Sequence, residues 1–213
     1  MTEMRRSQAQ RRAATRAAIL TAARALFAEH GYHACSIDTI LARAESSKGA
    51  FYHHFRDKAA VLEALLAEFE EEGVRTSTEW SVGVTSPLEI IRISAHNLLA
   101  WCTDPYIRQV VLTDALSVLG FDRWHQIDDR YTLDVLDRLL QRGLEAGEVR
   151  PLPSTRMIAR LINAATNQAA LFVANAVDVE AARDEASAGI DHLITSIAGI
   201  NPAESRALAG ANS

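Results

Sequence analysis

Apolar residues recur at helical spacing along almost the whole chain, and no stretch alternates with the two-residue period of a half-buried strand. Residues 19, 20, 23, 26 and 27 line one face of a first helix, for example, and residues 61, 62, 65, 66 and 69 line another. With 213 residues, 48% of them hydrophobic, the chain can bury a sizeable core. We therefore predict an all-α protein of about nine helices.

Capping residues divide the first part of the chain into short helices. Gly31 follows a first helix that ends near His30, in the place of a left-handed C-cap. Ser36 is placed to cap a second helix that ends near residue 44, a third helix ends near His54, and Asp57 can cap a fourth.

Further helices are expected after residue 80. The sequence Ser86-Pro87-Leu88-Glu89 combines an N-cap serine, a proline at the first helical position and a capping-box glutamate. We expect that helix to reach about residue 102, with others over 104–120, 122–146, 154–176 and 180–198.

The composition of the sequence argues against several classes of protein. The longest apolar runs fall below the roughly 18 residues of a membrane span, so no membrane association is expected. Cys35 and Cys102 form no CxxC pattern, which fits a reducing, cytoplasmic location and two ordinary buried thiols. The Arg-rich N-terminus is interpreted as a basic arm, with organellar targeting as the alternative.

Charge is distributed unevenly. Residues 1–58 hold ten Lys or Arg and five acidic residues, whereas the remainder holds 12 and 22, within a net charge of −5. A basic N-terminal part on an acidic remainder suits a polyanion bound at one end, although a chance clustering of solvated charge is the alternative.

The stretch ESSKGAFYHHFRDK, residues 45–58, contains a short third helix that carries many hydrogen-bonding groups and only two residues to bury. Phe51 and Phe55 lie on its buried side, and Gly49, Ala50 and His53 lie on the opposite side. A glycine inside an exposed helix costs about 0.5–1 kcal/mol relative to alanine, so a partner is the expected reason for it. Small residues allow a helix to approach base edges in the major groove of DNA.

Three short helices joined by tight turns indicate a helix-turn-helix. Ser36, Ser47, Tyr52 and Lys58 are expected to contact phosphates beside the inserted helix. Arg5, Arg6, Arg11 and Arg12 either reach the minor groove or remain solvated.

The segment SIDTILARAESSKGAFYHHFRDKAAVLEALL, from Ser36 to Leu66, resembles the DNA-binding domain of the TetR family of transcriptional regulators. The resemblance runs from about residue 13 to residue 66. It implies a homodimeric, ligand-responsive repressor on double-stranded operator DNA. The positions that would contact DNA are Ser36, Ser47, Lys48, Gly49, Ala50, Tyr52, His53 and Lys58.

One departure from the family pattern lies in the turn before the third helix. The turn usually reads Ala-Gly-Val-Ser, and this chain has Ala44-Glu45-Ser46-Ser47. Loss of the glycine is expected to alter the backbone of the turn, and Glu45 is unfavourable near phosphates.

We expect a basic arm over residues 1–12, a helix-turn-helix domain over 13–58, an effector-binding and dimerisation domain over 59–200, and a polar tail over 201–213. Dimerisation is assigned to the last two helices, whose apolar stripes could alternatively be intramolecular core. The stripe residues are Ile158, Leu161, Ile162, Ala165, Ala169, Phe172, Ile190, Leu193, Ile194 and Ile197.

Large aromatic side chains suggest a pocket for an unknown small, largely apolar effector, although aromatic core is the alternative. The candidate lining is Phe69, Trp101, Tyr106, Trp124, Asn163, Asn167 and Phe172, with His96, Asn97, Asp114 and Gln168 as further polar groups.

Other classes of function find little support in the sequence. No nucleophile elbow or phosphate-binding glycine loop appears, so no enzyme activity and no cofactor are expected. His30, His33 and Cys35 could suggest a metal, but they lack a second ligand pair, and no metal is predicted. A helical carrier or scaffold would explain the aromatic residues but not the basic N-terminal part. The sequence leaves open whether DNA binding represses or activates.

Overall fold

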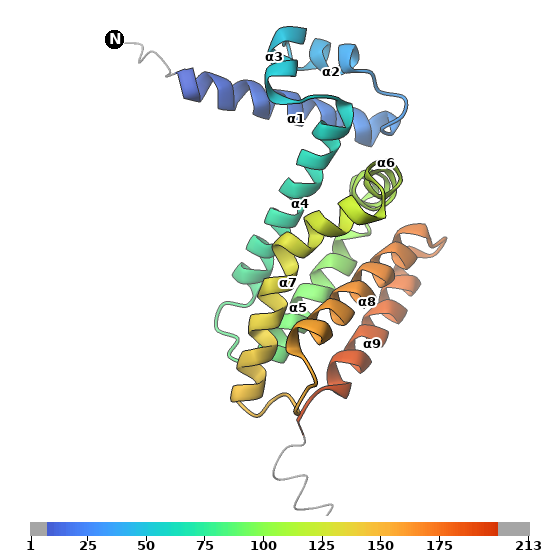
Figure 1. Cartoon of the computed structure of the whole chain (residues 1–213). Helices are drawn as coiled ribbons and strands as arrows, with labels where there is room; N and C mark the ends of the chain where they lie inside the picture. The colour runs from blue at the N-terminus through green and yellow to red at the C-terminus, as the bar shows by residue number, and fades with distance from the viewer. Residues whose placement is uncertain (1–7, 200–213) are drawn as a thin grey trace, which may run out of the picture. The chain divides into compact units, whose positions relative to one another are not determined.

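The computed structural model describes residues 8–199 (Figure 1). Within this range the chain forms nine α-helices and one π-helix. Their bounds are α1 Gln8–His30, α2 Ile37–Arg43, α3 Lys48–His54, α4 Lys58–Trp80, α5 Pro87–Trp101, η1 (the π-helix) Ile107–Asp114, α6 Ala115–Leu119, α7 Phe121–Glu145, α8 Thr155–Asn175 and α9 Val179–Ser196.

The all-α prediction is confirmed. Residues 8–199 contain no strand, and their only ladder pairing is an isolated antiparallel bridge between Val149 and Ala198. None of the helices in this range is both long enough and apolar enough to cross a membrane.

Local capping accounts for the helix boundaries. Gly31 has φ of 76° and its N–H donates to Phe27 O at 2.8 Å, which closes α1. Ser36 Oγ accepts the N–H of Thr39 at 3.0 Å, and Asp57 Oδ1 accepts the N–H of residue 60 at 2.7 Å. These predicted caps are all present, as is Ser86, which accepts the N–H of residue 89.

Two expectations need correction. The predicted arm is shorter than residues 1–12, because α1 already includes residues 8–12, so Arg11 and Arg12 are helical; Arg5 and Arg6 lie outside the described residues. The helix expected over 104–120 is divided instead into η1 and α6, and a π-helix of eight residues has no periodicity signal that sets it apart from an α-helix.

The chain divides into two compact units. We call residues 8–69 and 105–124 the head unit, and residues 70–104 and 125–199 the body unit. The division differs from the expected boundary at residue 58, because the first part of α4 and the segment 105–124 cluster with the N-terminal helices. Sequence periodicity could not reveal this, since it carries no information on contacts between distant segments.

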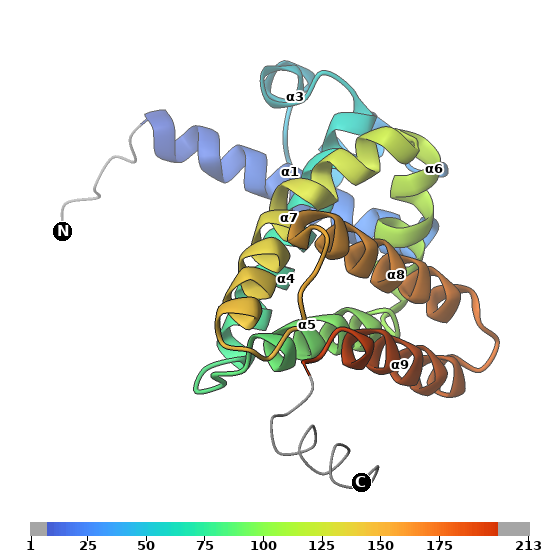
Figure 2. The ribbon, with the colours of Figure 1, turned by 60° about the horizontal axis from the view of Figure 1, so that its bottom comes forward.

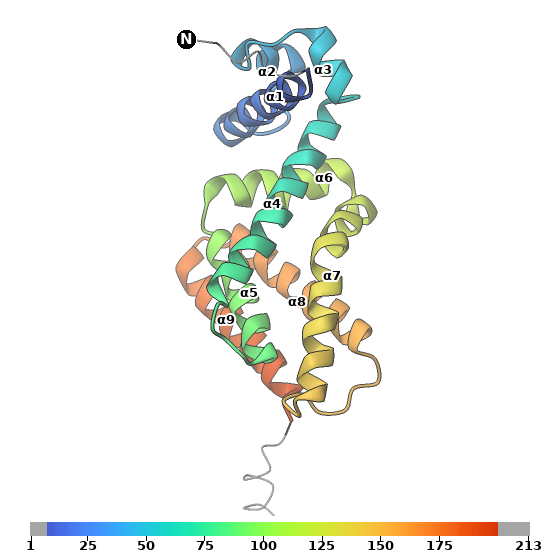
Figure 3. The same ribbon diagram turned by 90° about the vertical axis from the view of Figure 1, so that its left-hand side faces the viewer.

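Aromatic side chains form part of the core of the head unit. Helices α1, α2 and α3 lie against one another (Figure 3). Phe27 and Phe51 are fully buried, and the ring of Phe51 lies 5.7 Å from that of Phe55. Tyr32, in the turn after α1, packs edge-on against Phe27 at 5.2 Å. Its backbone N–H donates to Asp114 Oδ2 at 2.9 Å, which ties this turn to η1.

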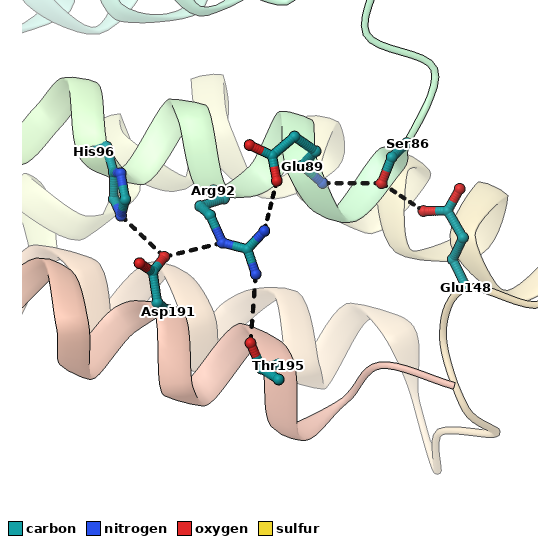
Figure 4. Close-up of polar contacts among 7 residues, drawn as sticks. All are labelled: Ser86, Glu89, Arg92, His96, Glu148, Asp191 and Thr195. Carbon is teal, nitrogen blue, oxygen red and sulfur yellow. Dashed lines mark hydrogen bonds and ion pairs between the residues drawn. The ribbon is translucent and has the colours of Figure 1, made fainter. Parts of the chain in front are cut away.

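In the body unit, α5, α8 and α9 lie side by side (Figure 2). A polar network links α5 to α9 (Figure 4): Arg92 Nε donates to Asp191 Oδ1 at 3.0 Å, and His96 Nε2 lies 3.0 Å from the same oxygen. Ser86 Oγ also donates to Glu148 Oε2 at 2.7 Å, so the start of α5 is bound to the segment after α7.

Candidate functional site

Helix α3 presents a surface of small and polar side chains because two aromatic rings hold its other side. Phe51 is fully buried and Phe55, which follows the helix, is 4% exposed. On the opposite side Gly49 and His53 are exposed, and Tyr52 is 58% exposed. Ser47 starts the helix by accepting the N–H of residue 50 at 3.2 Å. The predicted arrangement of buried and exposed faces is therefore present.

Nothing inside the described protein requires glycine at position 49. A Cβ added there would meet only Ser47 Oγ, at 4.0 Å, and the helix is regular at this point. Since glycine weakens an exposed helix by about 0.5–1 kcal/mol relative to alanine, the residue carries a cost without an internal packing reason. The remaining physical reason is close approach of another molecule to the backbone of α3.

Two predicted phosphate-contacting serines are also helix caps. The hydroxyl oxygens of Ser36 and Ser47 accept backbone N–H groups of α2 and α3. Both residues are exposed. A hydroxyl that accepts at a cap keeps its own O–H as a donor, so capping is compatible with a contact to phosphate.

Lys58 is engaged inside the head unit. Its Nζ donates to the carbonyl oxygens of Tyr32 at 2.8 Å and Cys35 at 2.7 Å, and lies 3.9 Å from the Tyr32 ring centroid. Burial lowers the pKa of Lys58. The residue therefore holds the turn between α1 and α2 in the free protein, and its expected contact with phosphate stays a prediction.

A hollow beside α3 brings in residues of α1 that the sequence did not associate with this helix. It has a volume of about 510 Å³ and is lined by Gln8, Arg11, Arg12, Thr15, Gly49, Ala50, His53 and His54. Burial and the positive charges of His53, Arg12 and Arg16 lower the pKa of His54. The hollow is basic and adjoins the exposed glycine. Had the helical pattern been extended back to residue 8, residues 11, 12 and 15 would have been placed together on α1.

The unusual turn before α3 adopts a left-handed backbone at Glu45, where φ is 48°. The N–H of Ser46 donates to Leu41 O at 3.0 Å and that of Glu45 reaches Ala42 O at 3.4 Å, which is the Schellman pattern. The turn thus has a left-handed helix cap, a position where glycine is usual, with Glu45 in its place. The cost of a side chain at this position appears as strain at one residue.

The body unit contains a buried polar cluster. Asp128 is 3% exposed, and its Oδ2 accepts from Asn163 Nδ2 at 2.6 Å and from Asn167 Nδ2 at 2.8 Å. Burial raises the pKa of Asp128 to about 6. Burial, with the nearby charge of Asp128, raises the pKa of Glu70 to about 8. Two of the predicted effector residues, Asn163 and Asn167, therefore meet at a carboxylate that the sequence analysis did not select.

The other candidate effector residues are dispersed. Phe69, Tyr106 and Trp124 belong to the head unit, where Trp124 is 5% exposed, whereas Trp101 belongs to the body unit. Phe172 is 49% exposed, and its place in a pocket lining stays a prediction. Among the further polar groups, Asp114 is bonded to Tyr32, His96 is paired with Asp191, and Gln168 is exposed.

The predicted dimer residues fall into two groups. Ile162, Ile190, Ile194 and Ile197 are buried within the chain, so they form intramolecular core and their assignment to an interface is corrected. Leu161, Phe172 and Leu193 are 57%, 49% and 47% exposed, and Ile158, Ala165 and Ala169 are half-buried. Met157, which the sequence analysis omitted, is 54% exposed on the same helix as Leu161.

Within residues 8–199 no group of three or more His, Cys, Asp or Glu side chains could hold a metal ion. Cys35 and Cys102 are both buried free thiols, and burial raises the pKa of Cys102 to about 12.

Comparisons with known proteins match both parts of the chain. The family model described as "Bacterial regulatory proteins, tetR family" matches residues 19–65, and "Tetracyclin repressor-like, C-terminal domain" matches residues 89–197. The HTH-type transcriptional repressor Rv1474c of Mycobacterium tuberculosis is 41% identical over 73 residues, which cover 34% of this chain and 39% of that protein.

Solved structures match over most of the chain. A TetR-family transcriptional regulator from Pectobacterium atrosepticum aligns with a TM-score of 0.78 and 28% identity, covering 92% of this chain and 100% of that chain. RolR in complex with resorcinol aligns with a TM-score of 0.69 and 22% identity, covering 95% and 96% of the two chains, and this likeness concerns the fold.

A helix-turn-helix with an exposed glycine on its third helix, followed by further helices, defines a DNA-binding transcriptional regulator. The chain belongs to the TetR family of these regulators.

Proposed function

We propose that the protein is a cytoplasmic homodimeric repressor that leaves a palindromic operator when a small effector binds to its C-terminal domain. The observation that carries the proposal is α3. Its outer side carries the exposed residues Gly49, Tyr52 and His53 beside the half-buried Ala50, and no packing inside the described protein accounts for the glycine. The absence of a side chain at Gly49 would let the backbone of α3 approach base edges in the major groove.

Phosphate contacts are assigned to residues around that helix. Ser36 and Ser47 retain hydroxyl donors at the starts of α2 and α3, and Lys48 is an exposed ammonium at the first turn of α3. The basic hollow with Arg11 and Arg12 adds charge on the α1 side. Phosphate contacts, including one from Tyr52, would set the register of the helix, while contacts from His53 would supply sequence preference.

Two copies of the helix-turn-helix are needed because one reads too few base pairs for specific binding. Half-sites about 34 Å apart, one turn of DNA, suit a two-fold dimer. The exposed apolar side chains of α8 and α9, including Leu161, Phe172 and Leu193, support an interface there. Such an interface would place two head units on one operator.

Release of the operator by the effector follows from thermodynamic linkage between DNA binding and effector binding. A small molecule in the C-terminal domain would shift α4 and change the separation of the two head units. The effector must then bind the free dimer more tightly than the DNA-bound dimer, typically by about 1–3 kcal/mol. The complex of RolR with resorcinol supports small-molecule binding in this fold.

The experiment uses fluorescence anisotropy with DNA from upstream of the protein's own gene, and compares the parent with Gly49→Leu. Leucine should strengthen α3 by roughly 0.5–1 kcal/mol, so the variant should melt no lower than the parent. Its DNA affinity should nevertheless fall about tenfold or more, because the side chain blocks close approach to the groove. Equal affinity of the two proteins would overturn the proposed role of α3.

A further inference from the structure

The hollow in the head unit gathers basic side chains from α1 and α3, which lie against each other (Figure 3). Arg11 and Arg12 come from α1, and His53 and His54 come from α3. Its volume of about 510 Å³ falls within the roughly 300–1,000 Å³ of pockets that hold whole small molecules. The hollow is therefore wide enough and basic enough for an anionic group.

Arg12 has no carboxylate partner in the described part of the chain. Further along α1, Arg16 lies 3.7 Å from Glu68 Oε1 and Arg24 lies 3.2 Å from Glu68 Oε2. Among residues 8–199, by contrast, no carboxylate oxygen lies within 4.0 Å of the Arg12 guanidinium. Since Arg12 is exposed and lines the hollow, its guanidinium can bind an anion that enters there.

The hollow adjoins the side of α3 that we assign to the major groove. Gly49, Ala50 and His53 line the hollow and also belong to that side of the helix. When a helix enters the major groove, the sugar-phosphate backbone passes along its flank, where phosphate contacts set the register. A phosphate of the DNA backbone is therefore the anion that suits this hollow.

His54 lines the hollow as a half-buried imidazole at the last position of α3. Burial and the positive charges of His53, Arg12 and Arg16 lower the pKa of His54 in the free protein. A phosphate in the hollow would bring a negative charge close to the imidazole, so the pKa of His54 would be higher in the complex. A group whose pKa rises on binding takes up a proton from solution.

The acidic side chains on the neighbouring helices are engaged elsewhere. Glu68 of α4 is bound to Arg16 and Arg24, and Asp38 of α2 is bound to Lys48 at the start of α3. The charges that act most strongly on the pKa of His54 are all positive. The neutral form of His54 is therefore favoured until an anion enters the hollow.

We propose that the hollow receives one phosphate of the operator backbone between α1 and α3, and that His54 takes up a proton when this phosphate enters. The inference rests on the proposed function, because it assigns a contact and a pH dependence to the same DNA complex. The affinity gained from the proton is fully present at low pH, where free His54 is already protonated. It is lost as the pH rises and bound His54 gives up its proton, by at most about tenfold per pH unit for each His54.

The first test measures the affinity of the full chain for the upstream DNA by fluorescence anisotropy, from about pH 6 to about pH 8.5 at constant ionic strength. The affinity of the parent should fall about threefold or more per pH unit over part of this range. His54→Gln keeps a hydrogen-bond donor that cannot be protonated, so it should match the parent near pH 8.5 and bind more weakly near pH 6. Equal pH dependence of the two proteins would overturn the inference.

Two further histidine variants assign the effect to one residue. His192→Gln, at an exposed position of α9 in the body unit, is the matched control and should keep the parental pH dependence. His53→Gln should lower the affinity and also keep the pH dependence. If His53→Gln abolishes the pH dependence and His54→Gln does not, the assignment to His54 is wrong.

Proton uptake can also be measured on the parent alone, which needs no variant to fold. Calorimetric titration with DNA near pH 7, in two buffers of different ionisation enthalpy, counts the protons that binding takes up. We expect a net uptake that decreases toward pH 8.5. Binding without proton uptake would contradict the proposal.

DNA in which single phosphates are replaced by uncharged methylphosphonates tests the phosphate itself. At one position in each half-site the replacement should weaken binding near pH 6 and abolish the pH dependence, because the charge that favours protonated His54 is gone. At other contacted positions it should weaken binding equally at every pH. A scan in which no position alters the pH dependence would rule out a phosphate in the hollow.

The same titrations separate this inference from the proposed function. If specific DNA binding occurs and His54→Gln leaves its pH dependence unchanged, only the inference about the hollow fails. If no specific DNA binding occurs at any pH, the proposed function fails.

Discussion

Asp38 and Lys48, on the neighbouring helices α2 and α3, form an ion pair in which Nζ lies 2.9 Å from Oδ1. Both side chains are exposed, and the hydrogen bond to Asp38 raises the pKa of Lys48. In the free protein the carboxylate therefore competes for an ammonium that we assign to a DNA phosphate. Surface pairs of this kind contribute little to stability, so the competition can be removed without unfolding the domain.

Asp38→Asn should strengthen DNA binding by roughly threefold to tenfold, because it frees Lys48 and removes a negative charge from the DNA-facing surface. Fluorescence anisotropy at fixed salt measures the change. In a Lys48→Met background the same substitution should have a smaller effect, since only the repulsion remains. An equal gain in both backgrounds would show that the ion pair is irrelevant to binding.

Lys58 should behave differently from Lys48. Lys58→Met leaves the carbonyl oxygens of Tyr32 and Cys35 without their donor, and should destabilise the protein by about 1–3 kcal/mol in urea denaturation. The dependence of DNA affinity on salt should keep its slope, because no phosphate contact is lost. For Lys48→Met the slope should fall by about 0.9. A similar fall for Lys58→Met would restore Lys58 to the phosphate contacts.

Glu45 occupies a left-handed conformation, with φ of 48°, that a side chain disfavours. Glu45→Gly should stabilise the protein by roughly 1 kcal/mol, since it relieves this strain. Glu45→Ala removes the same charge and keeps the strain, so it should not stabilise. Thermal melting distinguishes the two variants. If alanine stabilises as much as glycine, charge rather than backbone strain sets the cost.

The sequence predicted features that depend on residues close together in the chain. Caps such as Ser36, Asp57 and Gly31 act over three or four residues, so residue type and spacing suffice to place them. The buried side of α3 was predicted in the same way, because the helical period places Phe51 and Phe55 on one side of the helix. The contacts of Lys58 were not predicted because its partners lie 23 and 26 residues away, in a turn whose path the sequence does not reveal.

In the body unit, too, the sequence did not reveal contacts between distant segments. Apolar periodicity selected α8 and α9 correctly, but it cannot tell a stripe that packs on the chain from one that faces solvent, so Ile194 and Leu193 were grouped together. Asp128 and Glu70 were missed because acidic residues on amphipathic helices usually face solvent. Only the tertiary structure places Asn163 and Asn167 against Asp128.

The raised pKa values of Glu70 and Asp128 should make stability depend on pH. Glu70 has its pKa raised from 4.5 to about 8, so the folded state binds more protons than the unfolded state between these values. Stability is then fully present below about pH 4.5 and falls as the pH rises toward 8, by up to about 1.4 kcal/mol per unit for one proton.

Urea denaturation at pH 5, 6, 7 and 8, at one protein concentration, compares the parent with Glu70→Gln. The variant should lose most of this fall in stability and should be the more stable protein at pH 8. Glu71→Gln, next to it on α4, serves as the control and should follow the parent. Parallel curves for the parent and Glu70→Gln would show that Glu70 is ionised normally in the folded protein.

The exposed apolar face of α8 allows a test of dimerisation that leaves the core intact. Leu161 and Phe172 are 57% and 49% exposed, so a charge at either position costs little in an isolated chain. In a dimer interface the same charge would be desolvated without a partner, at a cost of several kcal/mol. Leu161→Glu with Phe172→Glu should therefore sediment as a monomer at micromolar concentration and melt as a folded helical protein.

Loss of the dimer should then weaken operator binding about 100-fold or more, because one head unit contacts only one half-site. Val82→Glu is the matched control: Val82 is 81% exposed in the turn after α4, and the variant should remain dimeric with parental affinity. Ile194→Glu, by contrast, places a charge in the core of the chain and should unfold it. If the double variant of α8 still sediments as a dimer, the interface lies elsewhere on the protein. If the parent sediments as a monomer, the proposed dimer is wrong.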